Sequence, residues 1–337
     1  TNRYLLFFDL LKGKEIQQYD WVYHSYGSLT ARAQLQQASG ALGSGDGYQH
    51  IQVSQRGTVS DMIDATWMQG DKGIRLLMSP TPQSSELILG KGPGNPPDRD
   101  CPLVMVRRNA QDTYFAGLLE PFVENSTVLN IEEVDLITEA AGQEALGFKI
   151  HHEKGTDLFI YSYDRGLKTV SDLQTDAQIF FVENNKELFQ VAFIDGKVVC
   201  SENAKLKLDR RGDFYLAKLA ENQYILGNKG TEKVQLTASL PFTVKDIDLY
   251  LLDIDYSRKE KLIILTSGEN QLLMELEPGS YYELTAGGTD GVAELLTEIL
   301  SEGPEFEYKV RELPADILEK ADSPKGVRIV VQGEDFV

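Results

Sequence analysis

The sequence is poor in the side chains that most often carry metal and nucleophile chemistry. Among 337 residues it has two cysteines, four histidines and two tryptophans. Cys101 and Cys200 are too few and too far apart for a disulfide framework or a zinc cluster, so we expect each to pack as a small apolar side chain. His151 and His152 are adjacent, and neighbouring residues of a strand point to opposite faces. We therefore expect no metal site and no cofactor.

Long apolar runs are also absent. No stretch of about 18 apolar residues is present, which excludes a membrane-spanning helix of the usual kind. The opening apolar segment, residues 4–11, is short and is interrupted by Asp9, so it does not have the pattern of a signal peptide. The chain begins at Thr1 without a methionine, which indicates a cut, and we expect further sequence upstream of it.

Basic residues are scarce relative to acidic ones. The chain has 33 Lys and Arg against 52 Asp and Glu, a formal net charge of −19. General nucleic-acid binding needs clustered basic side chains over a broad face, so this balance argues against it. Residues 1–150 hold 12 basic and 18 acidic side chains, whereas residues 151–337 hold 21 and 34. An anionic ligand is therefore expected to prefer the first half.

The dominant pattern in the sequence is alternation of apolar and polar residues, broken by Gly, Asn, Asp and Pro. A period of two is typical of antiparallel strands with one buried face. The segments with this pattern are 4–11, 15–25, 50–55, 73–79, 102–108, 113–122, 157–163, 177–184, 188–196, 213–219 and 261–267. Asp195-Gly196 and Arg211-Gly212 are expected to be turns between strands. The sequence thus predicts an all-β protein.

Helical patterning is confined to the end of the chain. "TDGVAELLTEILSEG" (289–303) predicts the largest helix, over about 289–302, and 313–322 is a shorter candidate. Residues 288–337 hold 12 acidic and 5 basic side chains. We expect a large antiparallel, supersandwich-like β-sandwich over 1–200, a smaller β unit over 201–287, and an acidic tail with one or two helices over 288–337.

The segment "GKGPGNPPDRDCP" (90–102) contains four prolines and three glycines. Proline lacks the amide hydrogen that a central strand or a helix interior uses. We expect a shaped loop here, which either contributes to a binding site or covers a sheet edge.

The segment "EIQQYDWVYHS" (15–25) raises the question of an acid/base site. On a strand, Tyr19, Trp21 and Tyr23 share one face, whereas Asp20 and His24 share the other. We expect the aromatic row to fill a sandwich core, and the alternative is a platform on which sugar rings stack. His24 is a hydrogen-bonded structural histidine in one interpretation and a ligand contact in the other.

Arg107 and Arg108 close the apolar segment 102–108, and only one of them can face a given side. An arginine fork fits the carboxylate of a uronic acid, and the alternative is a surface ion pair at a strand end. The candidate substrate-binding residues are therefore His24, Arg107 and Arg108. The chain has no Gly-Xaa-Ser-Xaa-Gly, phosphate-loop or His-Glu-Xaa-Xaa-His motif, and we assign no catalytic residue to it.

The order of several segments resembles the C-terminal β-domain of heparinase II/III-like polysaccharide lyases, including oligoalginate lyases. The segments are "LLFFDLL" (5–11), "YDWVYHSYG" (19–27), Trp67, "GKGPG" (90–94), "PLVMVRRNAQDTYFAGLLEPF" (102–122) and "GTDLFIYSY" (155–163). The resemblance covers roughly residues 4–200 and rests on order and spacing.

This resemblance implies a bacterial, secreted or periplasmic enzyme that cleaves uronate-containing glycans such as alginate by β-elimination. In that family an α/α-toroid precedes the β-domain and supplies most of the chemistry, so the chain alone is expected to be inactive. Its expected partners are an acidic polysaccharide or oligosaccharide and the missing N-terminal toroid. The alternative function is a stand-alone carbohydrate-binding or surface-adhesion β-protein.

Overall fold

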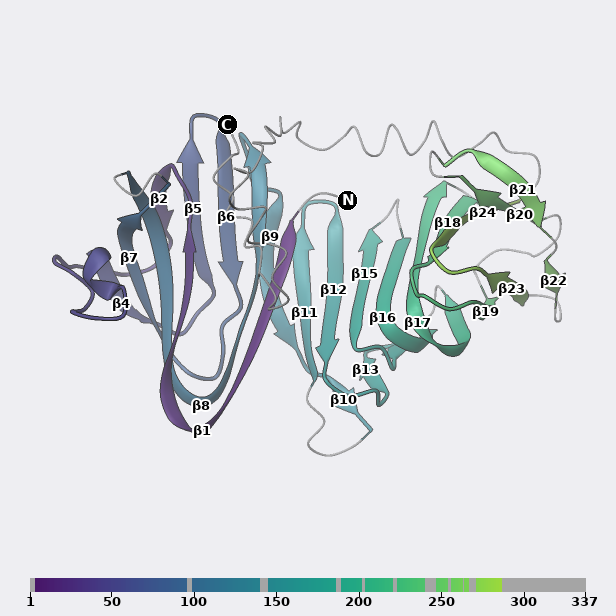
Figure 1. Ribbon diagram of the computed structural model, residues 1–337, viewed down its shortest axis with the longest axis horizontal. Helices are drawn as coiled ribbons and strands as arrows, with labels where there is room; N and C mark the ends of the chain where they lie inside the picture. Colours follow the sequence, from purple (N-terminus) through teal and green to yellow (C-terminus); the bar gives the residue numbers. More distant parts are fainter. Residues whose placement is uncertain are drawn as a thin grey trace, which may run out of the picture. The chain divides into compact units, whose positions relative to one another are not determined.

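The protein is built from antiparallel β-strands that form two compact units (Figure 1). The computed structural model describes residues 4–95, 99–139, 145–185, 189–201, 204–220, 223–239, 247–253, 256–262, 264–266 and 271–286. The described residues up to Ser126 form the N-terminal unit, and those from Thr127 onward form the C-terminal unit. The all-β prediction is confirmed, and the expected helices and acidic tail of 288–337 lie outside the described residues.

The N-terminal unit is a single antiparallel sheet. Its elements are β1 (Leu5–His24), β2 (Ser28–Ala31), β3 (Gln36–Gln37), the 3-10 helix η1 (Tyr48–His50), β4 (Gln52–Val59), β5 (Ile63–Gln69), β6 (Lys72–Met78), β7 (Ser85–Pro93) and β8 (Asp100–Val123). The strand order is β2-β5-β6-β8-β7-β4-β3, and β1 pairs with β8.

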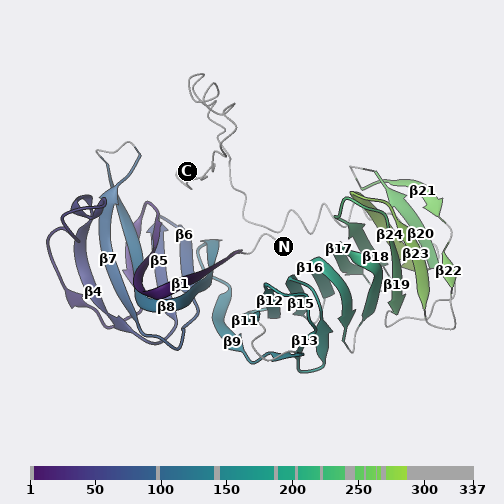
Figure 2. The ribbon, with the colours of Figure 1, turned by 60° about the horizontal axis from the view of Figure 1, so that its bottom comes forward.

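A bend in β1 and β8 converts this one sheet into two layers. Residues 5–12 of β1 pair with 112–119 of β8, residues 17–24 pair with 103–110, and the register shifts between these halves. The first part of β8 also pairs with β7 and the last part with β6. Figures 1 and 2 show β1 and β8 turning together, so that the strands beyond the bend face those before it.

The space between the two layers holds the core of the N-terminal unit. Trp67 and Phe115 are each 1% exposed there, among aliphatic residues of β5 to β8. Tyr19, Trp21 and Tyr23 pack against this cluster, and the Tyr23 ring meets Trp67 edge-on at 5.2 Å between centroids. The aromatic row of β1 is therefore part of the core, as the period of two predicted.

The predicted loop at 90–102 is largely strand, so that expectation was wrong. Residues 90–93 end β7, residues 100–102 begin β8, and the two stretches pair from Gly90↔Leu103 to Pro93↔Asp100. A Cβ at Gly90 would lie 2.5 Å from the carbonyl oxygen of Gln52 on β4, so glycine permits this close approach of two strands. The described part of the turn is held by the Tyr26 hydroxyl, which accepts from the Asn95 amide and donates to its carbonyl.

The C-terminal unit is a second antiparallel sheet. Its strands are β9 (Val128–Val134), β10 (Ile137–Thr138), β11 (Ala145–His152), β12 (Gly155–Ser162), β13 (Lys168–Val170), β14 (Leu173–Thr175), β15 (Ile179–Asn185), β16 (Phe189–Cys200), β17 (Lys205–Ala220), β18 (Gln223–Asn228), β19 (Val234–Ser239), β20 (Ile247–Leu252), β21 (Arg258–Leu262), β22 (Leu265–Thr266), β23 (Leu272–Leu276) and β24 (Ser280–Ala286). Its main path runs β21-β20-β24-β18-β17-β16-β15-β12-β11-β9.

Two long strands, β16 and β17, bend together in this unit and again create a second layer. Their first and last parts have different neighbours: β15 and β14 for β16, and β19 and β18 for β17. Gly196 lies opposite Gly212 at the bend, and a Cβ on Gly196 would lie within 2.8 Å of Phe193 and Ala177. The prediction of turns at Asp195-Gly196 and Arg211-Gly212 was therefore wrong, because both pairs lie inside continuous strands.

The core of the C-terminal unit is continuous across the boundary expected from sequence. One buried cluster includes residues from both sides of residue 200, such as Phe180, Phe214 and Tyr282. Val199 and Cys200 also pair with Leu206 and Lys205. The described chain thus divides at 126/127, within the range 1–200 that the sequence analysis treated as one sandwich.

Candidate functional site

Arg107, a predicted substrate contact, belongs to a row of alternating charges on the outward face of the N-terminal unit. The row crosses four neighbouring strands and consists of Asp20, Arg107, Glu86 and Arg56, which we call the charge ladder. Arg107 Nε and Nη2 donate to the two carboxylate oxygens of Asp20, each at 2.8 Å. Arg107 Nη1 lies 4.0 Å from Glu86 Oε2, and Arg56 Nε donates to Glu86 Oε1 at 2.8 Å.

Tyr48 contacts the Asp20–Arg107 pair of this ladder and strengthens it. Its hydroxyl donates to Asp20 Oδ2, and the Arg107 guanidinium lies 5.5 Å from its ring centroid. Burial alone would raise the pKa of Asp20, but hydrogen bonds from Arg107 and Tyr48 and the charge of Arg107 outweigh it and lower the pKa below 3.8. The bond to the Asp20 carboxylate also raises the pKa of Tyr48.

The ladder leaves Arg107 little capacity for a ligand. Its side chain is 14% exposed, and its bidentate edge is occupied by Asp20. Arg56 is more accessible, with 46% of its side chain exposed, although it also contacts Glu86. At this surface a glycan carboxylate would therefore meet Arg56 more readily than Arg107.

Arg108 points the other way, into the sandwich, and is 1% exposed. Its Nε donates to Ser85 Oγ at 2.7 Å, its Nη1 donates to the Tyr114 carbonyl, and its guanidinium lies 4.5 Å from the Phe115 ring centroid. Burial lowers the pKa of Arg108 to about 10, so the side chain stays charged at neutral pH. In this structure a surface glycan cannot reach it, and its contacts join the two sides of the β8 bend.

His24 lies apart from the charge ladder. It is half-buried near the end of β1, opposite Leu103, whereas Asp20 is opposite Arg107. Four residues of strand separate the two positions, which is about 13 Å. The structure therefore does not combine His24, Arg107 and Arg108 into one site.

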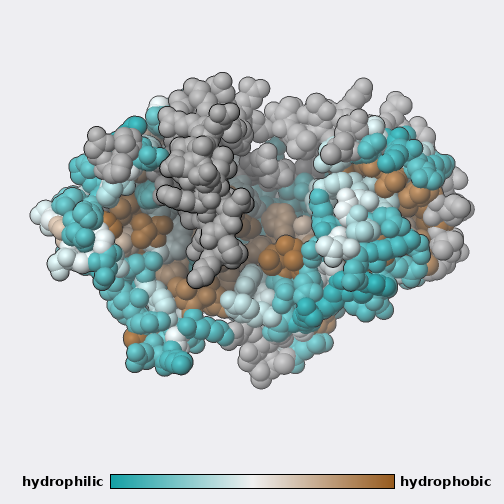
Figure 3. All heavy atoms as spheres, in the orientation of Figure 1, coloured by the Kyte–Doolittle hydropathy of each residue, from teal (hydrophilic) through white to brown (hydrophobic). Residues whose placement is uncertain are grey.

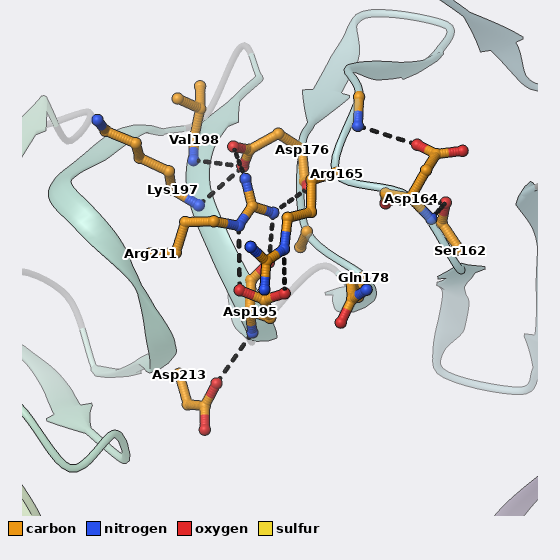
Figure 4. A network of polar contacts seen from close by, with 12 residues as sticks. Ser162, Asp164, Arg165, Asp176, Gln178, Asp195, Lys197, Val198, Arg211 and Asp213 are labelled. Atoms are coloured by element: carbon orange, nitrogen blue, oxygen red, sulfur yellow. Dashed lines mark hydrogen bonds and ion pairs between the residues drawn. The ribbon is translucent and has the colours of Figure 1, made fainter. Parts of the chain in front are cut away.

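A second polar cluster, which the sequence analysis missed, lies at the bend of the C-terminal unit (Figure 4). Asp176 and Asp195 flank the Arg211 guanidinium, with Nη1 2.8 Å from Asp176 Oδ2 and Nε 3.0 Å from Asp195 Oδ1. Asp176 Oδ1 also accepts the backbone amides of Lys197 and Val198, at 2.7 and 2.9 Å. These bonds fasten β17 to β16 and to the segment before β15, so the cluster stabilises the bend.

The described residues show two further properties that bear on function. Within them, no group of three or more His, Cys, Asp or Glu side chains is arranged to hold a metal ion. No helix in the same part of the chain is long and apolar enough to cross a membrane. The face drawn in Figure 3 is mostly hydrophilic, with apolar residues visible in separate areas.

Comparison with known proteins assigns no family to the chain. No protein-family model matches the sequence. No curated protein is significantly similar to it.

Proposed function

We propose that this chain is the C-terminal β-structured portion of a secreted or periplasmic polysaccharide lyase. The enzyme acts on uronate-containing glycans by β-elimination. The chain forms one wall of the glycan cleft and supports an α/α-toroid that carries the catalytic groups.

The observation that supports this proposal best is how the segments of the resemblance assemble. Residues 5–11 and 19–27 lie almost wholly in β1, which pairs along β8, the strand that holds 102–122. Residues 90–93 pair with the start of β8. Trp67 packs on Tyr23, and its indole donates to the carbonyl of Pro102 at 3.2 Å. These segments, scattered over residues 5–122, thus build one sheet, as expected for a shared domain, whereas the remaining segment, 155–163, lies almost wholly in β12 of the C-terminal unit.

The geometry of Asp20, Tyr23 and His24 supports a non-catalytic role for the chain. β-Elimination needs a base for the proton next to the uronate carboxylate, a group that neutralises that carboxylate, and an acid for the departing oxygen. Asp20 is bound by Arg107 and Tyr48 on the outward face. Tyr23 lies on the core side, where burial raises its pKa to about 12. The three side chains do not converge on one substrate position.

The exposed apolar side chains of β1 lie far apart along the bent strand, so they do not by themselves indicate contact with another part of an enzyme. Leu5, Ile16 and Val22 are 64%, 74% and 43% exposed. By contrast, Tyr19, Trp21 and Tyr23 pack against the core and do not form an open platform for sugar rings. This placement removes the feature that would most favour the alternative, a stand-alone carbohydrate-binding or adhesion protein.

The proposal is tested by retention on an immobilised polyuronate and by an eliminase assay on the same preparation. We expect the chain to be retarded on the polyuronate relative to a carboxyl-reduced matrix of the same polymer. Incubation with soluble polyuronate should not produce the ultraviolet absorbance of unsaturated uronate ends. Equal elution from both matrices, or elimination activity that survives further purification, would contradict the proposed role.

A further inference from the structure

Half-buried tyrosines and basic side chains gather on the outward face of the C-terminal unit. Tyr250 on β20, Tyr256 in the turn before β21, and Tyr281 on β24 are each half-buried, and the Tyr256 and Tyr281 ring centroids are 5.6 Å apart. We call these residues, with Lys229, Arg258 and Lys261, the tyrosine surface. Tyr250 and Tyr281 face away from the main core, because the alternate residues Leu249, Tyr282 and Leu284 fill that core. Tyr256 and Tyr281 pack instead against a smaller buried cluster, which consists of Ala217, Leu219, Ile225 and Leu252.

Lys229 is a preorganised cation at one edge of this surface. Its ammonium donates to the Tyr281 hydroxyl and lies 3.9 Å from the Tyr281 ring centroid. Asn228, which is fully buried, builds the turn beneath it: its amide donates to the carbonyls of Glu232 and Leu276 at 2.8 and 3.1 Å. Among the described residues no carboxylate lies within ion-pair distance of the exposed Lys229 ammonium, although residues 151–337 hold 34 acidic side chains against 21 basic ones.

Arg258 is held in place at the other side of the surface. It donates to both carboxylate oxygens of Glu283 at 2.7 Å, and Gln223 donates to one of them at 2.9 Å. Glu283 is completely buried, so this pair fixes the position of the guanidinium. The Arg258 guanidinium lies 4.4 Å from the Tyr250 ring centroid, and the Lys261 ammonium, which also pairs with Asp248, lies 5.9 Å from it.

The strand register sets the spacing between these two parts. Tyr250 is directly opposite Glu283, and Tyr281 is two residues before Glu283 on the same strand. Tyr250 and Tyr281 are therefore diagonal neighbours on adjacent strands, about 7–8 Å apart at the backbone. Two aromatic rings, each with a cation against it, can contact neighbouring sugars of one oligosaccharide.

We infer that the tyrosine surface binds a short uronate-containing oligosaccharide, with a sugar carboxylate on Lys229 and pyranose faces against Tyr281 and Tyr250. This inference rests on the proposed function and deepens it, because it places glycan contacts in the C-terminal unit. A hexuronate has both features that the surface matches: a face of C–H groups that packs on an aromatic ring, and a carboxylate that pairs with an ammonium. The acidic surroundings favour short ligands, because repulsion grows as a longer polyanion extends beyond Lys229.

Isothermal titration of the chain with a 1,4-linked hexuronate tetrasaccharide tests the inference. Lys229→Ala should weaken binding at least fivefold, and it should not change the affinity for the carboxyl-reduced, neutral tetrasaccharide. Tyr281→Ala should weaken the binding of both ligands. Matched controls are Lys233→Ala, which removes one positive charge from a lysine paired with Glu275 and Glu277, and Tyr163→Ala, which removes a tyrosine that is 51% exposed.

The outcomes separate this inference from the proposed function. Control affinities within twofold of the parent, with a loss in Lys229→Ala, support the tyrosine surface. If the parent binds the uronate tetrasaccharide and Lys229→Ala binds it as tightly as Lys233→Ala does, binding at the tyrosine surface is refuted and the proposed function stands. If the parent does not bind the uronate at all, both fail. Lys229 is exposed, so its substitution decides the matter even if Tyr281→Ala does not fold.

Discussion

Replacing Arg107 by alanine should destabilise the N-terminal unit strongly, because Asp20 would lose its counter-ion in a nearly closed environment. The Asp20 side chain is 9% exposed and that of Arg107 is 14% exposed. In Arg107→Ala, Asp20 would keep hydrogen bonds from Tyr48 and Gln18 but no bidentate cation. Removing one partner of a buried ion pair typically costs 3–5 kcal/mol, and the partial exposure here places the expected loss near 3 kcal/mol.

Arg56→Ala is the matched control, because it removes another arginine from the same charge ladder. The side chains of Arg56 and Glu86 are 46% and 28% exposed. An ion pair with that much contact with solvent is worth about 0.5 kcal/mol. The two alanine variants should therefore differ in unfolding free energy by about 2.5 kcal/mol.

Urea unfolding followed by tryptophan fluorescence measures this difference selectively. Both tryptophans of the chain, Trp21 and Trp67, lie in the N-terminal unit, so the signal reports on that unit. In Arg107→Ala, the dependence of the unfolding free energy on urea concentration should stay the same, and the urea concentration at the midpoint of unfolding should fall. A loss below about 1 kcal/mol in Arg107→Ala, or an equal loss in both variants, would show that the Asp20 pair does not stabilise the sandwich.

Three further predictions concern pH, the inner arginine and the second bend. The pKa of Asp20 is lower in the folded protein than its ordinary 3.8. Its carboxylate therefore stabilises the fold above about pH 4, and this contribution is lost as the pH falls through the folded pKa. The difference in unfolding free energy between the parent and Asp20→Asn, measured by urea unfolding at a series of pH values, should shrink as the pH falls. Arg108→Ala should lower the free energy of unfolding by about 3 kcal/mol in the same fluorescence assay, because it opens a cavity and removes the donor to the Tyr114 carbonyl. A loss below about 1 kcal/mol would contradict the proposal that Arg108 joins the two sides of the β8 bend. Gly196→Ala should lower the free energy of unfolding by about 1–3 kcal/mol, measured by thermal unfolding followed by circular dichroism. Gly45→Ala should leave the free energy of unfolding unchanged, because a Cβ at Gly45 meets nothing within 4 Å. Equal effects of the two substitutions would argue against crowding at the bend.

The sequence predicts the fold class well because alternation of apolar and polar residues is a local signal. It does not reveal that 4–11 and 15–25 belong to one strand, or that 102–108 and 113–122 belong to another. The polar residues at each bend resemble a turn, and the pairing that carries β1 and β8 through it is set by contacts about 100 residues apart. Strand pairing between residues so far apart in the sequence cannot be predicted from a short segment of it.

The candidate site shows the same limit. The period of two predicts that Arg107 and Arg108 face opposite sides, but the outward face depends on where the second layer packs. The tyrosine surface was missed because Lys229 follows the end of β18, whereas Tyr250 and Tyr281 lie in β20 and β24. Only the order β18-β24-β20 brings these residues together.

The central claim, that this β-structured chain recognises uronate glycans, is tested most directly by comparing two ligands that differ only in charge. The measurement is the equilibrium affinity of the chain for a hexuronate tetrasaccharide and for its carboxyl-reduced form, at low and at high salt. We predict that the acidic ligand binds at least tenfold more tightly at low salt and that the preference narrows at high salt, because exposed charges are screened. Equal affinities at low salt, or no binding of either ligand, would contradict the account.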